Sequence, residues 1–302
     1  MRTTENDTLS SRLADTVERL EALIGQEAVS EDYVRFRIGL AKAQASVREV
    51  IVQRESSTVA GDAGPIATSP ALTRGAIQWD RALLASLFED VRALVVRSGN
   101  QTAGLAGLQE AAEEDAGLLE ELAEVSAFGD EQSLLELSNR VGTAADVLLF
   151  VGRVLAAPFI AEAAHRRRKV VAPVAASRES SGHCPVCGSP PALARLRQDD
   201  RKRILCCLLC EETWAFARVE CPFCGNDDQG TMGLVTVTGV EAWWIEVCDK
   251  CKRYIKTVDE SKLSEIDDVL PVVEDTATLY LDLIAQREGY ARYVVDVVGE
   301  GN

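Results

Sequence analysis

Four Cys-x-x-Cys pairs, confined to one stretch of the chain, constrain the fold more than any other feature. In chain order the pairs are Cys184/Cys187, Cys207/Cys210, Cys221/Cys224 and Cys248/Cys251. All nine cysteines lie between Cys184 and Cys251, and the other 234 residues contain none. An odd total, crowded pairs and no recognisable export signal disfavour a disulfide framework. We therefore predict that this segment binds metal.

The spacing of the pairs predicts two sites of four thiolates each. The first and third pairs occur as CPVCG and CPFCG, in which Pro presets one dihedral and Gly permits a positive φ, so two thiolates can face one ion. Nineteen residues separate Cys187 from Cys207 and twenty-three separate Cys224 from Cys248. In both intervals the residues follow the pattern of a β-hairpin, with two strand-like runs on either side of a turn. Pairing neighbours gives one site of Cys184, Cys187, Cys207 and Cys210, and a second of Cys221, Cys224, Cys248 and Cys251.

The chemistry of a four-thiolate site limits what the ion can do. Because no coordination position is open to water, metal-assisted hydrolysis is disfavoured and the sites are either structural or redox-active. Thiolates alone do not separate zinc from a single iron, and iron would permit one-electron transfer. Cys206 is left over and is predicted to be a packed or partly exposed thiol. His183, beside Cys184, is predicted not to be a ligand.

The residues before the cysteines predict an all-helical domain. Apolar residues recur at helical spacing over 13–24, 36–50, 84–94, 105–125 and 134–155, and the Ser, Gly and Pro content of 56–75 predicts a loop. The longest nearly uncharged run, Val147 to Ala161, contains Arg153 and is shorter than the roughly 20 residues of a membrane span. We therefore expect a buried helix there and no membrane insertion. The polar start lacks the apolar core of an export signal, which predicts a cytoplasmic protein.

Charge and motif content weigh against two functional classes. The net charge of -16 opposes a polyanionic partner, and residues 181–256 carry ten basic and ten acidic side chains, so we expect no nucleic-acid binding. The phosphate loop GxxxxGK[ST], GxGxxG and GxSxG do not occur, and the chain has two histidines. These observations predict a protein that is not an enzyme.

Together these patterns predict an α+β, multidomain fold. An N-terminal all-α domain (1–170) and a linker (171–182) precede two small rubredoxin-like, or zinc-ribbon, β units (183–219 and 220–258). A C-terminal helical tail (259–302) follows the second unit.

Five segments in the second half of the chain carry a family resemblance. They are CPVCGSPP from Cys184, LCCLLCEETW ending at Trp214, RVECPFCGN from Arg218, EVCDKCKRYIKT ending at Thr257, and VEDTATLYLDLIAQREGYAR from Val273 to Arg292. Together they resemble the formate dehydrogenase accessory proteins, called FdhE. The last segment contains no cysteine, so the likeness exceeds that of a generic zinc ribbon. The helical half resembles the family only in length, helicity and position.

The resemblance implies a cytoplasmic, non-enzymatic factor for maturation of the catalytic subunit of a molybdenum- or tungsten-dependent formate dehydrogenase. It also implies that the eight paired cysteines are ligands of two metal ions, iron or zinc, with iron favoured, and it transfers no catalytic residue. We therefore predict a client-specific chaperone or assembly factor. A one-electron redox protein acting on a client metal centre is the alternative, followed by a zinc-ribbon nucleic-acid binder.

Overall fold

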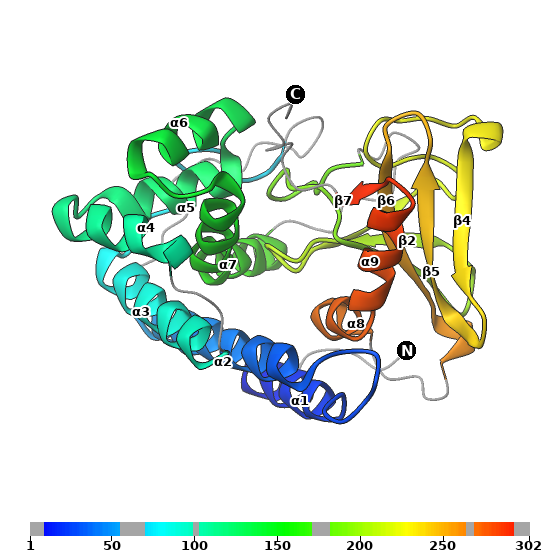
Figure 1. The fold of residues 1–302 in the computed structure, drawn as a ribbon, viewed down its shortest axis with the longest axis horizontal. Helices are drawn as coiled ribbons and strands as arrows, with labels where there is room; N and C mark the ends of the chain where they lie inside the picture. The colour runs from blue at the N-terminus through cyan, green and yellow to red at the C-terminus, as the bar shows by residue number, and fades with distance from the viewer. Residues whose placement is uncertain (1–8, 55–69, 99–102, 171–181, 264–268, 293–302) are drawn as a thin grey trace. The chain divides into compact units, whose positions relative to one another are not determined.

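The computed structural model describes residues 9–54, 70–98, 103–170, 182–263 and 269–292 (Figure 1). The chain divides into two compact units, one of residues 1–60 and 74–163 and another of residues 61–73 and 164–302. The predicted linker 171–182 lies outside the described residues except for Gly182, as does most of the predicted loop 56–75.

The first unit is built from helices. Their bounds are α1 (Leu9–Glu21), α2 (Glu31–Gln53), α3 (Arg81–Arg97), α4 (Ala103–Glu114), α5 (Leu118–Phe128), α6 (Glu131–Val141) and α7 (Ala145–Val170), whose last turns belong to the second unit. Side chains at the residues preceding three of these helices accept hydrogen bonds from first-turn amides. Ser30 caps α2, Asp80 caps α3 and Asp130 caps α6, which satisfies donors that would otherwise lack a partner.

Two of the five predicted helical stretches are each split into two helices. The stretch 105–125 breaks between α4 and α5, where the Asp115 carboxylate accepts from the Gly117 amide at 2.8 Å. The stretch 134–155 breaks after α6, where Gly142 adopts φ 70° and ends the helix. Apolar spacing continues across both breaks because the connecting turns are short, so periodicity alone did not locate them.

Helix α7 confirms the prediction of a buried apolar helix. Among the described residues, its stretch Ala145–Arg167 is the one helix long and apolar enough to cross a membrane, and 78% of the most apolar window is buried inside the protein. Leu148, Val151 and Leu155 are fully buried. This burial is that of a core helix in a globular fold.

The second unit is organised around one mixed sheet. Its strands are β1 (Leu193–Leu196), β2 (Arg203–Cys206), β3 (Thr213–Phe216), β4 (Met232–Val237), β5 (Val240–Cys248), β6 (Arg253–Asp259) and β7 (Ala291–Arg292). The order is β3-β2-β1-β6-β5-β4, and β7 pairs with β6. The predicted hairpins between the cysteine pairs are confirmed as β1–β2 and β4–β5, both antiparallel.

A parallel pairing joins the two cysteine-bearing halves. Strand β1 runs parallel to β6, with Leu193 opposite Lys256 and Ala194 opposite Thr257. The two ribbons therefore share one sheet.

The C-terminal helices α8 (Pro271–Ala277) and α9 (Leu279–Arg287) pack beside this sheet (Figure 1). Leu281 and Ala285 of α9 form a core cluster with Ile245, Val247 and Tyr254 of the sheet. The predicted fold class is confirmed: a helical region, two ribbon-like β elements and short C-terminal helices.

Candidate metal centres

The first group of cysteines gathers four sulfurs from two turns. Cys184 and Cys187 lie in the turn before β1, and Cys207 and Cys210 lie in the turn between β2 and β3. The four Sγ atoms all lie within 4.8 Å of one another. Cys184 Sγ is 3.4 Å from Cys210 Sγ, and Cys187 Sγ is 3.6 Å from Cys207 Sγ. All four side chains are buried.

The second group repeats the arrangement at the β4–β5–β6 end of the unit. Cys221 Sγ is 3.7 Å from Cys251 Sγ, Cys224 Sγ is 3.8 Å from Cys248 Sγ, and all four atoms lie within 4.8 Å. Asn226 donates from Nδ2 to Cys248 Sγ at 3.5 Å. The structure thus gathers the eight sulfurs in the two predicted groups.

The backbone shapes all four Cys-x-x-Cys turns alike. The residue after the second cysteine has a positive φ in each turn: 74° at Gly188, 61° at Glu211, 68° at Gly225 and 54° at Lys252. Glycine takes this conformation without strain, whereas Glu and Lys do so at some cost. The amides of Gly188 and Gly225 donate to the carbonyls of Cys184 and Cys221, both at 2.9 Å.

The sulfur geometry fits a tetrahedral ion. Four sulfurs held about 2.3 Å from one ion are separated from each other by about 3.8 Å in a regular tetrahedron, and the paired sulfurs here lie 3.4 to 3.8 Å apart. Each group could therefore hold one metal ion, and an all-sulfur set suits zinc or iron rather than magnesium or calcium.

Without an ion, the clustered thiols differ in pKa. Burial raises the pKa of Cys184, while hydrogen bonds from Cys184, Cys207 and Cys210 hold the pKa of Cys187 well below its ordinary value. Burial likewise raises the pKa of Cys221 to about 11. Burial also acts to raise the pKa of Cys248, but hydrogen bonds from the backbone and from Asn226 outweigh it, and that pKa is about 7. Metal binding would displace the remaining protons.

Cys206 and His183, the two residues predicted not to be ligands, belong to neither sulfur group. Cys206 is fully buried in an apolar cluster with Leu193, Val258 and Val269, and burial raises its pKa to about 12. His183 is half-buried and belongs to neither sulfur group.

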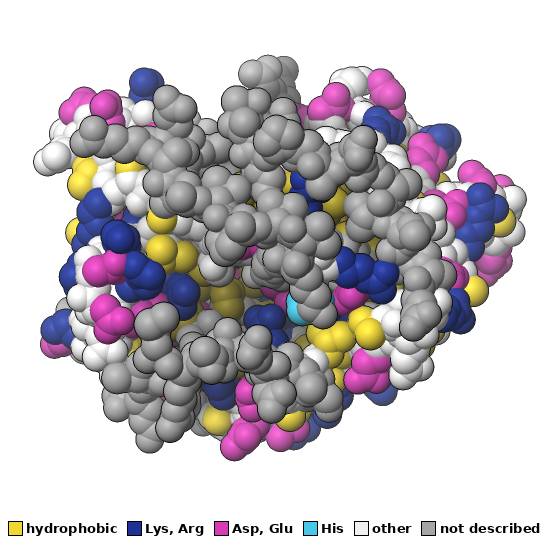
Figure 2. All heavy atoms as spheres, turned by 180° about the vertical axis from the view of Figure 1, so that it is seen from behind, with side chains coloured by type: hydrophobic (Ala, Val, Ile, Leu, Met, Phe, Trp, Pro, Cys, Tyr) yellow, Lys and Arg dark blue, Asp and Glu magenta, His cyan; other side chains and the backbone are white. Residues whose placement is uncertain are grey.

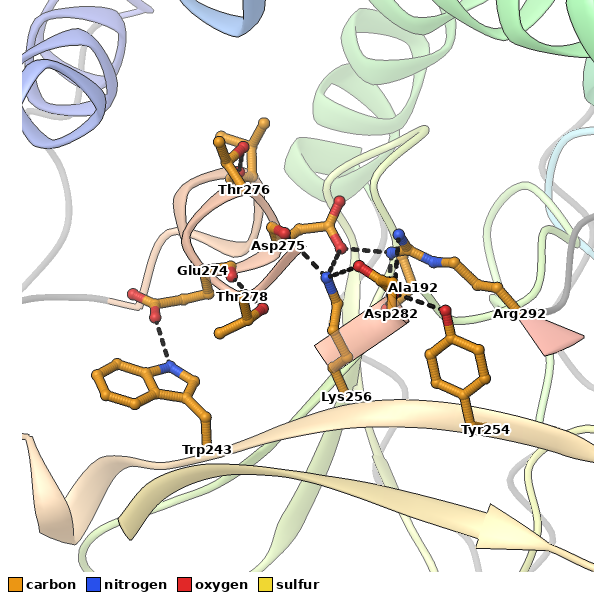
Figure 3. A network of polar contacts seen from close by, with 11 residues as sticks. Ala192, Trp243, Tyr254, Lys256, Glu274, Asp275, Thr276, Thr278, Asp282 and Arg292 are labelled. Atoms are coloured by element: carbon orange, nitrogen blue, oxygen red, sulfur yellow. Dashed lines mark hydrogen bonds and ion pairs between the residues drawn. The ribbon is translucent and has the colours of Figure 1, made fainter. Parts of the chain in front are cut away.

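Sequence reasoning missed a buried polar network between strands β5 and β6 and the C-terminal helices (Figure 3). Lys256 Nζ lies between Asp275 and Asp282, 2.7 Å from a carboxylate oxygen of each. Tyr254 donates to Asp282 at 2.6 Å, and Arg292 reaches Asp275 at 2.5 Å. Two cations thus meet two carboxylates, which balances the buried charge.

The same network ties three parts of the second unit together. Arg292 also donates to the carbonyl of Ala192, next to β1, at 3.3 Å. Trp243 on β5 donates from Nε1 to Glu274 of α8 at 2.9 Å. The signal in the sequence was the presence of acidic residues among the apolar residues of 273–292. A strictly amphipathic helix would have exposed these acids on its polar face.

Comparison with known proteins finds similar sequences over the cysteine-bearing part of the chain. The central domain of FdhE matches residues 183–218, and the C-terminal domain of FdhE matches residues 219–298. An FdhE homolog of Aquifex aeolicus is 31% identical over 120 residues, which are 39% of this chain and 41% of the relative. One from Haemophilus influenzae Rd is 32% identical over 118 residues, 38% of this chain and 37% of the relative. The matched region is thus about two fifths of the relatives' length, and over it the resemblance to FdhE is confirmed.

A solved structure extends the likeness to the whole fold. The crystal structure of the FdhE protein from Pseudomonas aeruginosa superposes with a TM-score of 0.58 over 93% of this chain and 92% of that chain. Sequence identity is 22%, so this comparison supports the shared fold, including the helical half that the sequence matches do not reach.

Proposed function

We propose that this chain, which matches the central and C-terminal domains of FdhE over residues 183–298, is an accessory factor for a formate dehydrogenase. Its client would be the catalytic subunit of a molybdenum- or tungsten-dependent enzyme, which it would bind in the cytoplasm during maturation. The observation that carries this proposal is the pair of FdhE domain matches over a segment in which both four-cysteine groups are complete.

The eight paired cysteines would serve as metal ligands within two units, residues 183–219 and 220–258. An ion bound by each group would supply a cross-link that contributes folding free energy to a small β element with little core of its own. Iron is favoured over zinc by the family resemblance. Four sulfurs leave no open coordination position, which supports a binding role without catalysis.

The distribution of charge supports a protein client over nucleic acid. On the face drawn in Figure 2, Lys and Arg side chains of the described residues are interspersed with Asp and Glu. A nucleic-acid binder needs a continuous basic face, and the net charge of -16 opposes one.

Co-purification from the native host tests the proposal. The tagged full chain should retain the formate dehydrogenase catalytic subunit, and Cys221→Ser should lower its recovery several-fold because the second unit loses its ion. Cys206→Ser, which alters a sulfur outside both groups, is the matched control and should retain the client. Equal client recovery with all three chains, or none with the parent in cells that make the enzyme, would contradict the proposal.

A redox role is the second candidate, and it is favoured by the exposure of Cys224 and the partial exposure of Cys251. An electron carrier needs an ion near the surface, and it needs iron. A purified protein that contains iron and loses its visible absorption reversibly on reduction supports this candidate, whereas colourless protein with stoichiometric zinc contradicts it.

A further inference from the structure

The two sulfur groups differ in their access to solvent. In the first group every cysteine is at most 2% exposed. In the second, Cys221 and Cys248 are equally buried, but Cys251 is intermediate and Cys224 is exposed. In both groups the four Sγ atoms lie within 4.8 Å of one another, so the difference in exposure comes from what surrounds them.

One cause is a short segment from earlier in the chain. Ala71 and Leu72 cross the first Cys-x-x-Cys turn, and their amides donate to the carbonyls of Pro185 and Val186 at 3.0 and 2.6 Å. Leu72 is fully buried, and Val186 is also buried. Phe223, the residue of the third turn that corresponds to Val186, is only half-buried.

A second cause is the pair of residues that stand between the two cysteines of the later Cys-x-x-Cys turn in each group. In the first group they are Leu208 and Leu209, and Leu209 is buried. In the second they are Asp249 and Lys250, both exposed. The apolar residues bring the turn Cys207–Cys210 into the core, whereas the charged residues keep the turn Cys248–Cys251 in contact with water.

Access decides how a closed four-sulfur site exchanges its ion. An incoming donor must reach the ion as one sulfur leaves. A bond between the ion and the donor forms, one ion–sulfur bond breaks, and the departing thiolate takes a proton from water. In the second group Cys221 is buried and Cys248 accepts a hydrogen bond from Asn226. Cys224 is the most exposed of the four cysteines, so its thiolate is the one best placed to leave the ion.

We propose that the two groups have different roles: the second is an exchange site that gives up its ion and reacts with thiol-directed compounds through Cys224, and the first is a permanent structural site. The incoming ligand for the exchange site is a thiolate or a nitrogen-containing chelator, because both donor types bind zinc well. This inference rests on the proposed metal ligation but not on the identity of the client.

Zinc release from the full chain tests the proposal. Protein loaded with two equivalents of zinc is mixed with excess 4-(2-pyridylazo)resorcinol, and the colour of the zinc complex is followed. One equivalent should appear at least about 10-fold faster than the other, because only one group is open to the chelator. Cys224→Ser should abolish the fast equivalent and keep the slow one, and Leu72→Ala should speed the slow one. Two equivalents released at one rate would overturn the proposal.

Alkylation gives a readout that does not depend on any variant folding. Iodoacetamide forms a sulfur–carbon bond as iodide leaves, and mass mapping of the briefly treated, metal-loaded parent should find Cys224 modified first among the nine cysteines. Modification of the first group's cysteines before Cys224 would overturn the proposal. Client recovery is measured separately, so two-rate zinc release without client binding refutes the proposed function and leaves this inference intact.

Discussion

Arg203 Nη2 lies 2.6 Å from Glu246 Oε2, with the two side chains 0% and 10% exposed. Arg203 is on β2, between the cysteine pairs of the first group, and Glu246 is on β5, which leads into Cys248 of the second. Arg203 also donates from Nη1 to the carbonyls of Ala217 and Glu220, at 3.2 and 2.8 Å. One buried guanidinium therefore links the two ribbons. It also binds the backbone at Glu220, the residue before Cys221.

Replacing this arginine should weaken the fold strongly. Arg203→Met removes the guanidinium from the buried Glu246 carboxylate, to which the Thr257 hydroxyl still donates, and the loss of one partner of a buried pair costs about 3–5 kcal/mol. Urea unfolding of the metal-loaded chain measures the loss. The control is Arg197→Met, which removes an exposed ion pair with Asp200 and should cost under about 1 kcal/mol. Equal stability of the two variants would show that the buried pair is dispensable.

The Lys256 network gives a second stability prediction. Lys256→Met removes the cation that lies between Asp275 and Asp282 while Arg292 still pairs with both, and we expect a loss of about 3–5 kcal/mol. Hydrogen exchange followed by mass spectrometry should show faster exchange in α8 and α9. Lys252→Met, on the exposed side of the adjoining turn, should leave both helices protected. Unchanged exchange in the Lys256 variant would contradict the structural role of the network.

The sequence predicted what depends on local spacing, and it did not predict what depends on distant partners. The cysteine groups, both hairpins and the helical first half follow from periods and turns within about thirty residues. The pairing of β1 with β6 joins residues some sixty positions apart, Leu193 and Lys256 among them, and no local pattern encodes it. The same holds for Ala71 and Leu72, which cover the first cysteine turn.

Two glycines in equivalent turns should differ in their tolerance of a side chain. Both Gly188→Ala and Gly225→Ala place alanine at a positive φ, which costs about 1 kcal/mol. A Cβ at Gly188 would also lie 2.9 Å from Pro70 Cγ, whereas at Gly225 the nearest atom is 4.0 Å away. Thermal unfolding of the metal-loaded chain should therefore show the larger loss for Gly188→Ala. The opposite order would mean that the segment at Pro70 does not rest on the first turn.

Cys206 should be replaceable without loss of metal. Cys206→Ser should keep the parent's metal content, because the first group is complete without it. The serine hydroxyl would enter the cluster of Leu193, Val258 and Val269, so we expect a loss of about 1–3 kcal/mol. Elemental analysis and urea unfolding of one preparation measure both. Loss of one metal equivalent would show that Cys206 is a ligand.

The central claim is that eight sulfurs form two separate four-thiolate metal sites, and metal content per chain tests it most directly. Elemental analysis of the purified full chain should give two ions, and Cys184→Ser and Cys221→Ser should each retain one. The paired variant Cys184→Ser/Cys221→Ser should retain none. Two ions retained in every variant, or none in the parent purified under reducing, chelator-free conditions, would contradict the account.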